Sequence, residues 1–313
     1  MKKQIFAALA ALALTFAAQQ GAGASDAAPV TVDNYGRKVT VTETPQRVLA
    51  LGPNCTELFI ALGLGDKIIG NTLDNHSRGP LPEYAAEYAR VPELNYGSAT
   101  REAALTSGAD FVFGIDWEFG GGGLDIAELE ANGMNVLVER ASSFDEAYDE
   151  IRSLGKIFKI EARAEEFIKE QERRMKAVAD KIKGREPLRV LVYDSGSSGV
   201  FTCSGENFES LLIERAGGEN VFGGLTGKQW VTVSYEEAVA REPQVIVIHD
   251  YDSPSVEAKI AEIKANSALS QLECVKNERF VTIALESVLP GSRMAYAVER
   301  FAAGFYPELF TDK

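Results

Sequence analysis

The sequence predicts an α/β protein of two lobes, each a mainly parallel sheet flanked by helices, joined by one long rigid helix. The first observation behind this prediction is that short apolar strands alternate with helices in both halves of the chain. Such alternation is typical of parallel sheets covered by helices. The second observation is residues 161–183, where good helix formers dominate and neither proline nor glycine occurs.

The apolar residues of this joining helix recur at threes and fours, and Gly184 follows as a helix stop. A helix of this length would span about 35 Å, the width of a small domain. We therefore expect residues 159–184 to connect two lobes stiffly. The pattern alone also fits an ordinary surface helix of a single domain.

A hairpin and then alternating strands and helices are expected in the first half of the chain. Two β-branched runs flank Asn34-Tyr35-Gly36, whose residue types favour a turn. Gly52-Pro53-Asn54 breaks the first apolar strand before a helix begins. In this half we expect strands at 47–51, 67–70, 110–115 and 135–138, and helices at 56–62, 101–107, 124–132 and 143–157.

The second half repeats the alternation. A glycine-serine loop, 194–207, follows its first strand, and Gly217-Gly218 stops its first helix. We expect strands at 188–193, 244–248 and 280–284, and helices at 208–216, 234–240, 254–264 and 293–304. The chain is accordingly divided into a signal peptide (1–24), an N-terminal lobe (29–158), the connecting helix (159–184) and a C-terminal lobe (185–313).

Ligands of parallel sheets bind beyond the carboxyl ends of the strands. Two facing lobes would bring these ends to one cleft. The loops that we place at the cleft are those at Asn54, Trp117, 195–203, Tyr251 and 286–293.

Residues 1–24 have the pattern of a secretory signal peptide. Lys2 and Lys3 precede an apolar run, and Ala22-Gly23-Ala24 matches a small-x-small cleavage site, so we expect cleavage after Ala24. No cysteine lies nearby to carry a lipid, and no later stretch approaches the roughly 20 apolar residues of a membrane helix. We therefore expect export to the periplasm, with membrane contact only through a partner.

The net charge of the chain limits its possible partners. Loss of the two signal-peptide lysines changes the formal net charge from −14 to −16, which argues against nucleic acid as a partner. We expect a soluble monomer.

The chain has three cysteines, Cys55, Cys203 and Cys274, which is an odd number for a protein in an oxidising compartment. At most one disulfide can therefore form within the chain, and the sequence does not indicate which pair would form it.

Several segments, in their order along the chain, resemble solute-binding proteins of ABC importers for iron-siderophores, haem and cobalamin. They are TVDNYGRKVTVTETPQRVLALGPNCTELFIALGLGDKIIG, SATREAALTSGADFVFG, FTCSGENFESLLIERAGGENVF and WVTVSYEEAVAREPQVIVI. The resemblance covers residues 30–308. It implies two lobes held rigid by the connecting helix, and an ABC importer permease dimer as partner.

The resemblance also implies one acidic docking residue for the permease on each lobe, at Glu102 and Glu236. A carboxylate in the first turn of a helix is favoured by the helix dipole and can meet an arginine of a partner. The alternative is that both are merely solvated first-turn acids. Glu237 is the ambiguous neighbour of Glu236, which fits the family pattern better.

Histidine is too scarce for a metal site of the kind found in metal-ion-binding relatives. His76 and His249 are the only histidines, whereas those relatives hold bare zinc or manganese with several. We expect no protein metal site and no covalent cofactor. The expected ligand is an organic complex that holds its own metal, an iron(III)-siderophore, with a corrinoid or haem as the alternatives. His249 ends a buried strand and is expected to be structural.

Aromatic and guanidinium side chains are the main candidates for ligand contact. The flat faces of Trp117 and Trp230 suit a macrocycle or a catecholate, although an isolated tryptophan is often part of a core. Arginines can bind an anionic ligand, although those in polar loops are often only solvated. The full set of candidates is Trp230, Arg293, Trp117, Asn54, Cys55, Arg78, His76 and Tyr251.

We do not expect an enzyme. Residues 195–199 lack the Gly-x-Ser-x-Gly elbow of hydrolases, and residues 120–123 lack the lysine and hydroxyl of a phosphate loop. Cys55 could be an activated thiol at a helix N-terminus. An exported hydrolase or redox enzyme is therefore the competing class.

Overall fold

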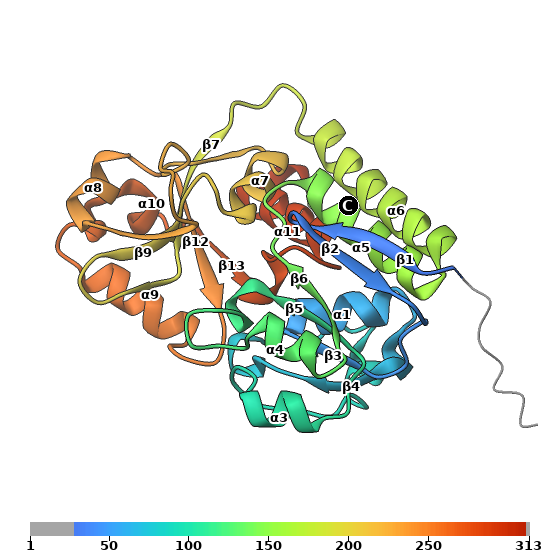
Figure 1. Ribbon diagram of the computed structural model, residues 1–313. Coiled ribbons are helices and arrows are strands. Elements are labelled where there is room, and N and C mark those ends of the chain that lie inside the picture. The colour runs from blue at the N-terminus through green and yellow to red at the C-terminus, as the bar shows by residue number, and fades with distance from the viewer. Residues whose placement is uncertain (1–27, 311–313) are drawn as a thin grey trace, which may run out of the picture.

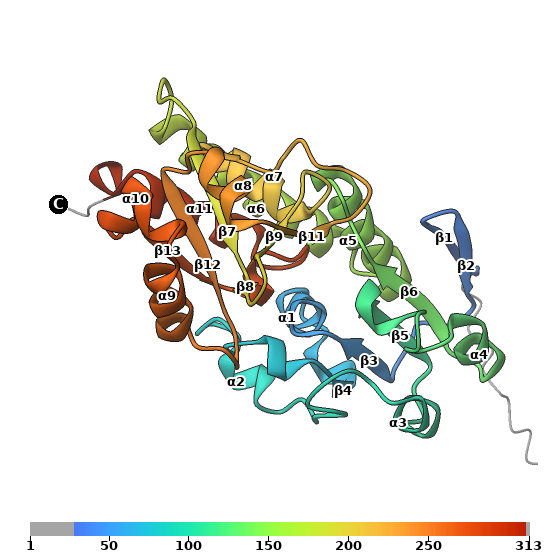
Figure 2. The same ribbon diagram turned by 90° about the vertical axis from the view of Figure 1, so that its left-hand side faces the viewer.

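The structure is a computed structural model, and it describes residues 28–310. Two four-stranded sheets form its two lobes, with the orders β4-β3-β5-β6 and β10-β7-β12-β13 (Figures 1 and 2). Every neighbouring pair in them is parallel. The predicted fold class is therefore confirmed. The predicted signal peptide, residues 1–24, and the last three residues lie outside the described part of the chain.

The N-terminal lobe is built on a parallel sheet whose central strands are buried on both faces. A hairpin precedes it and turns at Tyr35 and Gly36, both with left-handed backbone (φ 56° and 82°). The strands are β1 (Val30–Asn34), β2 (Arg37–Val41), β3 (Val48–Leu51), β4 (Ile68–Asn71), β5 (Phe111–Ile115) and β6 (Asn135–Glu139). The helices are α1 (Pro53–Ala61), α2 (Ala85–Tyr88), α3 (Arg101–Thr106), α4 (Ile126–Ala131) and α5 (Phe144–Phe158).

The C-terminal lobe repeats the plan with a second parallel sheet and its own core. Its main strands are β7 (Leu188–Tyr193), β10 (Gly218–Asn220), β12 (Val245–Asp250) and β13 (Phe280–Ala284). Its helices are α7 (Phe208–Arg215), α8 (Tyr235–Ala240), α9 (Val256–Ala265), α10 (Glu273–Lys276) and α11 (Met294–Phe305).

A small antiparallel sheet in this lobe corrects the expectation of a plain loop at 194–207. It consists of β8 (Ser195–Gly196), β9 (Val200–Cys203) and β11 (Trp230–Val233). Trp230 pairs with Cys203, and Val233 pairs with Val200. The glycines and serines around the short VFTC run obscured its strand character, because the partner that stabilises it lies about 30 residues further along the chain.

The long helix α6 (Glu161–Lys181) is continuous, as predicted, and lies beside α5 and α11 (Figure 1). Its buried stripe is Ala164, Ile168, Gln171, Met175 and Val178.

The helix α6 makes polar contacts with elements of both lobes. Arg163 donates to the carbonyl of Leu62 after α1 (2.8 Å), and the amide of Ala295 in α11 donates to Gln171 Oε1 (2.8 Å). These contacts support α6 as the connection between the lobes, while the domain limits 29–158 and 185–313 stay predictions. Within residues 28–310, no helix has the length and apolar character needed to cross a membrane.

Candidate functional site

Loops at the carboxyl ends of strands from both lobes converge on one pocket. Trp117 follows β5 and Arg140 follows β6, while Trp230 begins β11 and Phe208 begins α7. The cavity has a volume of about 20 Å³, room for about one water molecule. Its lining is Ile115, Asp116, Trp117, Glu139, Arg140, Ala141, Asn207, Phe208, Gln229, Trp230, Val288, Leu289 and Pro290. We call this pocket the cleft.

Aromatic rings form much of the cleft. Trp117 is 37% exposed, and within residues 28–310 only Tyr96 and Trp117 are large apolar residues that are exposed to solvent. Trp230 stacks on Phe201, with ring centroids 5.5 Å apart. Phe144 of α5 packs edge-on against Phe208 of α7 at 5.3 Å and so joins the two lobes on one side of the cleft. Both tryptophans predicted from the sequence therefore line the cleft.

On the other side of the cleft, polar contacts join the lobes. His76 lies 6.1 Å from the ring of Trp117 and 6.2 Å from that of Tyr251. The Arg78 guanidinium lies 3.4 Å from Asp250, and both side chains are partly exposed. We call His76, Arg78, Asp250 and Tyr251 the rim. Three of the predicted ligand residues thus lie together here, beside the cleft rather than within its lining.

The floor of the cleft is made of buried acids and an amide. Asn54 Nδ2 donates to Glu139 Oε2 (3.0 Å) and to the carbonyl of Pro290 (2.9 Å). Burial, with Glu150 and Asp116 nearby, raises the pKa of Glu139 well above its usual range. Burial also raises the pKa of Asp116. The raised pKa of Glu139 favours its neutral form and so reduces the negative charge of the floor.

The predicted ligand residue Arg293 lies in a buried polar seam between the lobes. It is 5% exposed and donates to both carboxylate oxygens of Glu57 in α1 (2.8 and 2.6 Å). A second carboxylate, Glu286, lies 3.2 Å from the same guanidinium and accepts from Ser77 (3.0 Å). In this structure the guanidinium thus faces Glu57 and Glu286 and is absent from the cleft lining.

Cys55, Cys203 and Cys274 are all free and buried. Burial raises the pKa of the Cys55 thiol well above its usual range, helped by nearby Glu139. A buried thiol of raised pKa is a poor nucleophile. The geometry therefore gives no support to an activated thiol at Cys55.

His249 is fully buried, and both of its ring nitrogens contact carboxylates, as expected of a structural histidine. His76 differs because its ring is only partly buried, and that burial lowers its pKa. Within residues 28–310, no group of three or more His, Cys, Asp or Glu side chains has the arrangement of a metal site.

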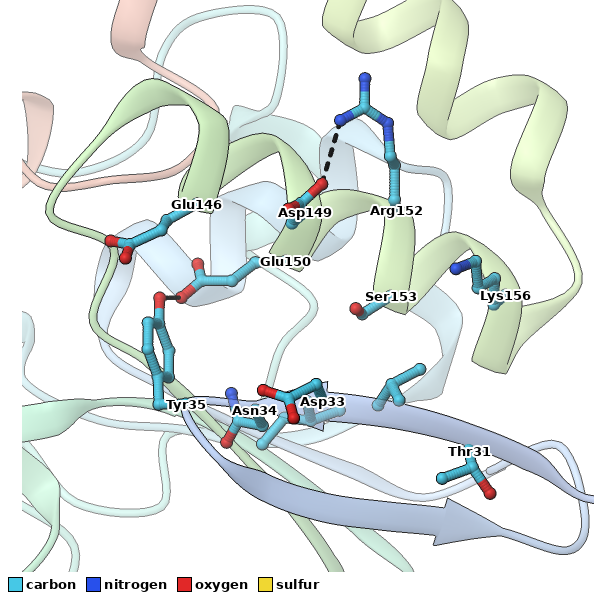
Figure 3. Close-up of a pocket in the computed structure, with 12 residues that line it drawn as sticks. Thr31, Asp33, Asn34, Tyr35, Glu146, Asp149, Glu150, Arg152, Ser153 and Lys156 are labelled. Atoms are coloured by element: carbon cyan, nitrogen blue, oxygen red, sulfur yellow. Dashed lines mark hydrogen bonds and ion pairs between the residues drawn. The ribbon is translucent and has the colours of Figure 1, made fainter.

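A separate groove lies outside the cleft, between α5 and the β1–β2 hairpin (Figure 3). Its volume is about 480 Å³, and charged side chains line it. The Tyr35 hydroxyl donates to Glu150, whose Oε1 also accepts from the amide of Arg140 (3.1 Å). Burial raises the pKa of Glu150 to about 8. Glu150 thus connects the groove to the backbone of a cleft residue.

The two predicted docking acids are exposed, each in the first turn of a helix. These helices, α3 and α8, lie on different lobes (Figure 1). Glu102 follows the cap of Thr100 in α3, and Glu236 follows the cap of Ser234 in α8. Glu237 lies 3.6 Å from Arg241.

Sequence reasoning missed several residues of the cleft lining. Glu139 and Arg140 directly follow the expected strand 135–138, so the carboxyl-end rule applied to the other strands would have found them. Asn207, Phe208 and Gln229 reach the cleft through β9 and β11, which were not expected.

Comparison with known proteins decides the family. Residues 48–285 match the periplasmic binding protein family. The chain belongs to that family. The resemblance found in the sequence is thereby confirmed.

Individual proteins that are similar to this chain have names that specify a transport role or a ligand. The chain is 27% identical to the ABC transporter substrate-binding lipoprotein YvrC of Bacillus subtilis, over 91% of this chain and 88% of that protein. It is 26% identical to a vitamin B12-binding protein of Yersinia pestis, over 66% of this chain and 70% of the relative. A solved Fe³⁺-hydroxamate transport protein from Saccharomonospora viridis covers 88% of this chain and 99% of its own length, with a TM-score of 0.75 and 22% identity. This last likeness concerns the fold alone.

Proposed function

We propose that this periplasmic binding protein captures an organic metal chelate at the cleft and delivers it to the permease dimer of an ABC importer. The cleft has a volume of about 20 Å³ in this structure, so the loops that line it must move apart to admit such a ligand. The observation that carries the proposal is the meeting of Trp117 and Trp230, one from each lobe, in the lining of a single pocket. Flat aromatic faces bind macrocycles and catecholates well. Family membership and the ABC transporter relative support a binding role rather than an enzyme.

An iron(III)-siderophore is our first candidate for the chelate. Arg140 lines the cleft and Arg78 stands at the rim, and guanidinium groups bind the anionic oxygens that such ligands present. A corrinoid is the second candidate, supported by the vitamin B12-binding relative. Haem is the third member of the class.

In this proposal the candidate ligand-binding residues have different roles. Trp117 and Trp230 contact the ligand, and the rim residues His76, Arg78 and Tyr251 control access to it. Asn54 supports the floor through Glu139. Cys55 and Arg293 are buried behind the cleft, and their contact with ligand depends on a change of conformation.

The proposed setting is the periplasm, after removal of the signal peptide, with the protein acting as a monomer. Glu102 and Glu236 are the proposed docking groups. Their exposure on opposite lobes supports this assignment, because two anchors would fix one orientation on a permease dimer.

Native mass spectrometry of the purified mature protein tests the proposal. A co-purifying metal chelate at one to one is the expected result. Titration with ferric ferrioxamine B, cyanocobalamin and haemin, followed by tryptophan fluorescence, should show saturable binding of at least one. The proposal would be overturned if none of the three compounds bound and the protein instead bound a bare metal ion or a sugar. Turnover of a substrate by the purified protein would also overturn it.

A further inference from the structure

A buried cluster of charged side chains surrounds His249, near the end of β12. It lies directly behind Trp230, which lines the cleft. The His249 Nδ1 lies 3.0 Å from Asp194 Oδ1, after β7. Its Nε2 lies 3.0 and 3.1 Å from the two carboxylate oxygens of Glu209 in α7. His249 and Glu209 are both 0% exposed.

This geometry favours the charged form of the ring. A neutral imidazole has one N–H, so one of its nitrogens would present a lone pair to a carboxylate. Only the imidazolium donates from both nitrogens. Burial alone would lower the pKa of His249, but Glu209 and Asp194 raise it to about 9.

Other titratable groups around the ring complete a balanced cluster. Lys259 of α9 donates to the backbone carbonyl of His249 (2.7 Å) and is itself 0% exposed. Burial lowers the pKa of Lys259 to about 8. Cys203 of β9 faces Glu209, and burial keeps its thiol protonated by raising its pKa. Tyr251, which follows β12, also lies beside the cluster, and Asp250 and His76 act on Lys259 and Asp194 from outside it. With two carboxylates and two cations, the cluster has no formal net charge.

Two side chains extend from this cluster to the cleft and its rim. The ring of Trp230 packs edge-on against His249, with centroids 5.7 Å apart. The Tyr251 hydroxyl donates to Asp194 Oδ2 (3.0 Å), and the Lys259 ammonium lies 3.6 Å from the centroid of the Tyr251 ring. The cluster therefore contacts one cleft aromatic through His249 and one rim aromatic through Asp194 and Lys259.

We propose that His249 is a positioning residue: held as an imidazolium between Asp194 and Glu209, it fixes Trp230 and Tyr251 in the orientation that receives the ligand. Loss of its charge leaves two buried carboxylates that repel each other, and they separate or take up protons. Either change moves the groups that hold the two aromatic rings. The effect on ligand binding rests on the proposed function, whereas the charge of His249 and the placement of Trp230 do not.

The first test measures the protonation of His249 directly. The untagged mature protein contains only two histidines, so ¹⁵N labelling of histidine gives a simple spectrum, and His76→Asn identifies the remaining signal as His249. Both ring nitrogens should stay protonated until about pH 9. Glu209→Gln should lower the midpoint by more than about one pH unit, and Glu214→Gln, an exposed acid on the same helix, should leave it unchanged. A neutral tautomer in the wild type at pH 7 would overturn the proposal.

The second test measures the position of Trp230 without any ligand. Trp117→Phe leaves Trp230 as the sole tryptophan. In that background Glu209→Gln, or Asp194→Asn if the first variant does not fold, should raise quenching by acrylamide at least about twofold at a pH between the His249 midpoints of the variant and of the wild type. The Glu214→Gln control should leave the quenching as it was. Unchanged quenching in a variant whose His249 has lost its charge would contradict a positioning role.

The third test concerns binding of whichever probe among ferric ferrioxamine B, cyanocobalamin and haemin the wild type takes up. Glu209→Gln should weaken its affinity at least about tenfold at a pH between the His249 midpoints of the variant and of the wild type, where only the wild-type ring is charged. The Glu214→Gln control should stay within about twofold. Equal affinities in a variant with displaced Trp230 would overturn the inference. If no probe binds the wild type, the proposed function fails, while the first two measurements still decide the role of His249.

Discussion

Arg293 and Glu57 form a buried bidentate ion pair between the segment before α11 and the first helix of the N-terminal lobe, at 2.8 and 2.6 Å. Glu57 also accepts from Ser292 (2.9 Å) and from the amide of Leu81 (3.0 Å). The lobes are therefore joined by a buried polar seam in addition to α6.

Glu57→Gln should destabilise the protein because it removes one of the two negative partners of a buried guanidinium. Breaking a buried pair costs about 3–5 kcal/mol. The cost here should lie near the lower end, about 3 kcal/mol, because Glu286 still lies 3.2 Å from Arg293. Urea unfolding measures it, with the exposed Glu83→Gln as control. Equal stability of the two variants would show that the seam contributes little.

Trp117→Ala and Trp230→Ala should each weaken binding of the chelate. Aromatic residues in a desolvated pocket commonly contribute about 2 kcal/mol or more, so an affinity loss of about thirtyfold or greater is expected. Trp117 is the cleaner case, because its ring is 37% exposed and its removal leaves the core intact. Isothermal titration with the bound probe gives the affinity, and circular dichroism verifies the fold. Unchanged affinity in both variants would place the ligand elsewhere.

Glu150→Gln should stabilise the protein at pH 8 and change little at pH 4.5. Burial raises the pKa of Glu150 in the folded state to about 8, so its contribution to stability is present in full below about pH 4.5 and is lost as the pH rises through 8. Glutamine resembles the protonated acid and can still accept from Tyr35 and Arg140. We expect a gain of at least about 1 kcal/mol at pH 8.

Thermal unfolding at both pH values measures this difference. Glu172→Gln, an exposed acid on α6, is the control and should behave alike at both. A gain of the same size at both pH values would mean that the carboxyl group is not the cause.

The sequence predicted those parts of the fold that local patterns determine. The helix α6 and seven of the eight parallel strands in residues 28–310 follow from hydrophobic periodicity and helix stops, and they appear close to the expected limits. The short parallel strand β10 was not expected, because Gly217-Gly218 was interpreted only as a helix stop. The strands β9 and β11 were missed because neither is recognisable without the other.

The same limit applies to the site. Arg293 was predicted to contact the ligand, but in the structure its guanidinium pairs with Glu57. Glu57 lies 236 residues earlier in the chain, and no local sequence pattern reveals that pairing. Trp117 and Trp230 could be placed because each lies beside the carboxyl end of a strand or in a family motif. The charge cluster around His249 could not, because Asp194, Glu209 and Lys259 meet only through the sheet and its covering helices.

Glu102→Ala and Glu236→Ala should each reduce uptake through the cognate permease while affinity for the chelate stays within about twofold of wild type. Each acid is exposed at the start of a short helix, on opposite lobes. One exposed ion pair contributes only about 0–1 kcal/mol, but partial desolvation against arginines of the permease raises this value, and two pairs together fix the orientation.

Uptake into vesicles that contain the permease, measured beside affinity in solution, separates docking from binding. Glu237→Ala is the matched control, because Glu237 is the exposed neighbour of Glu236 and already faces Arg241 at 3.6 Å. The double variant should transport more slowly than either single variant, since each acid anchors a different lobe. Normal transport by the double variant, or a loss of affinity that parallels the loss of transport, would rule out docking by these carboxylates.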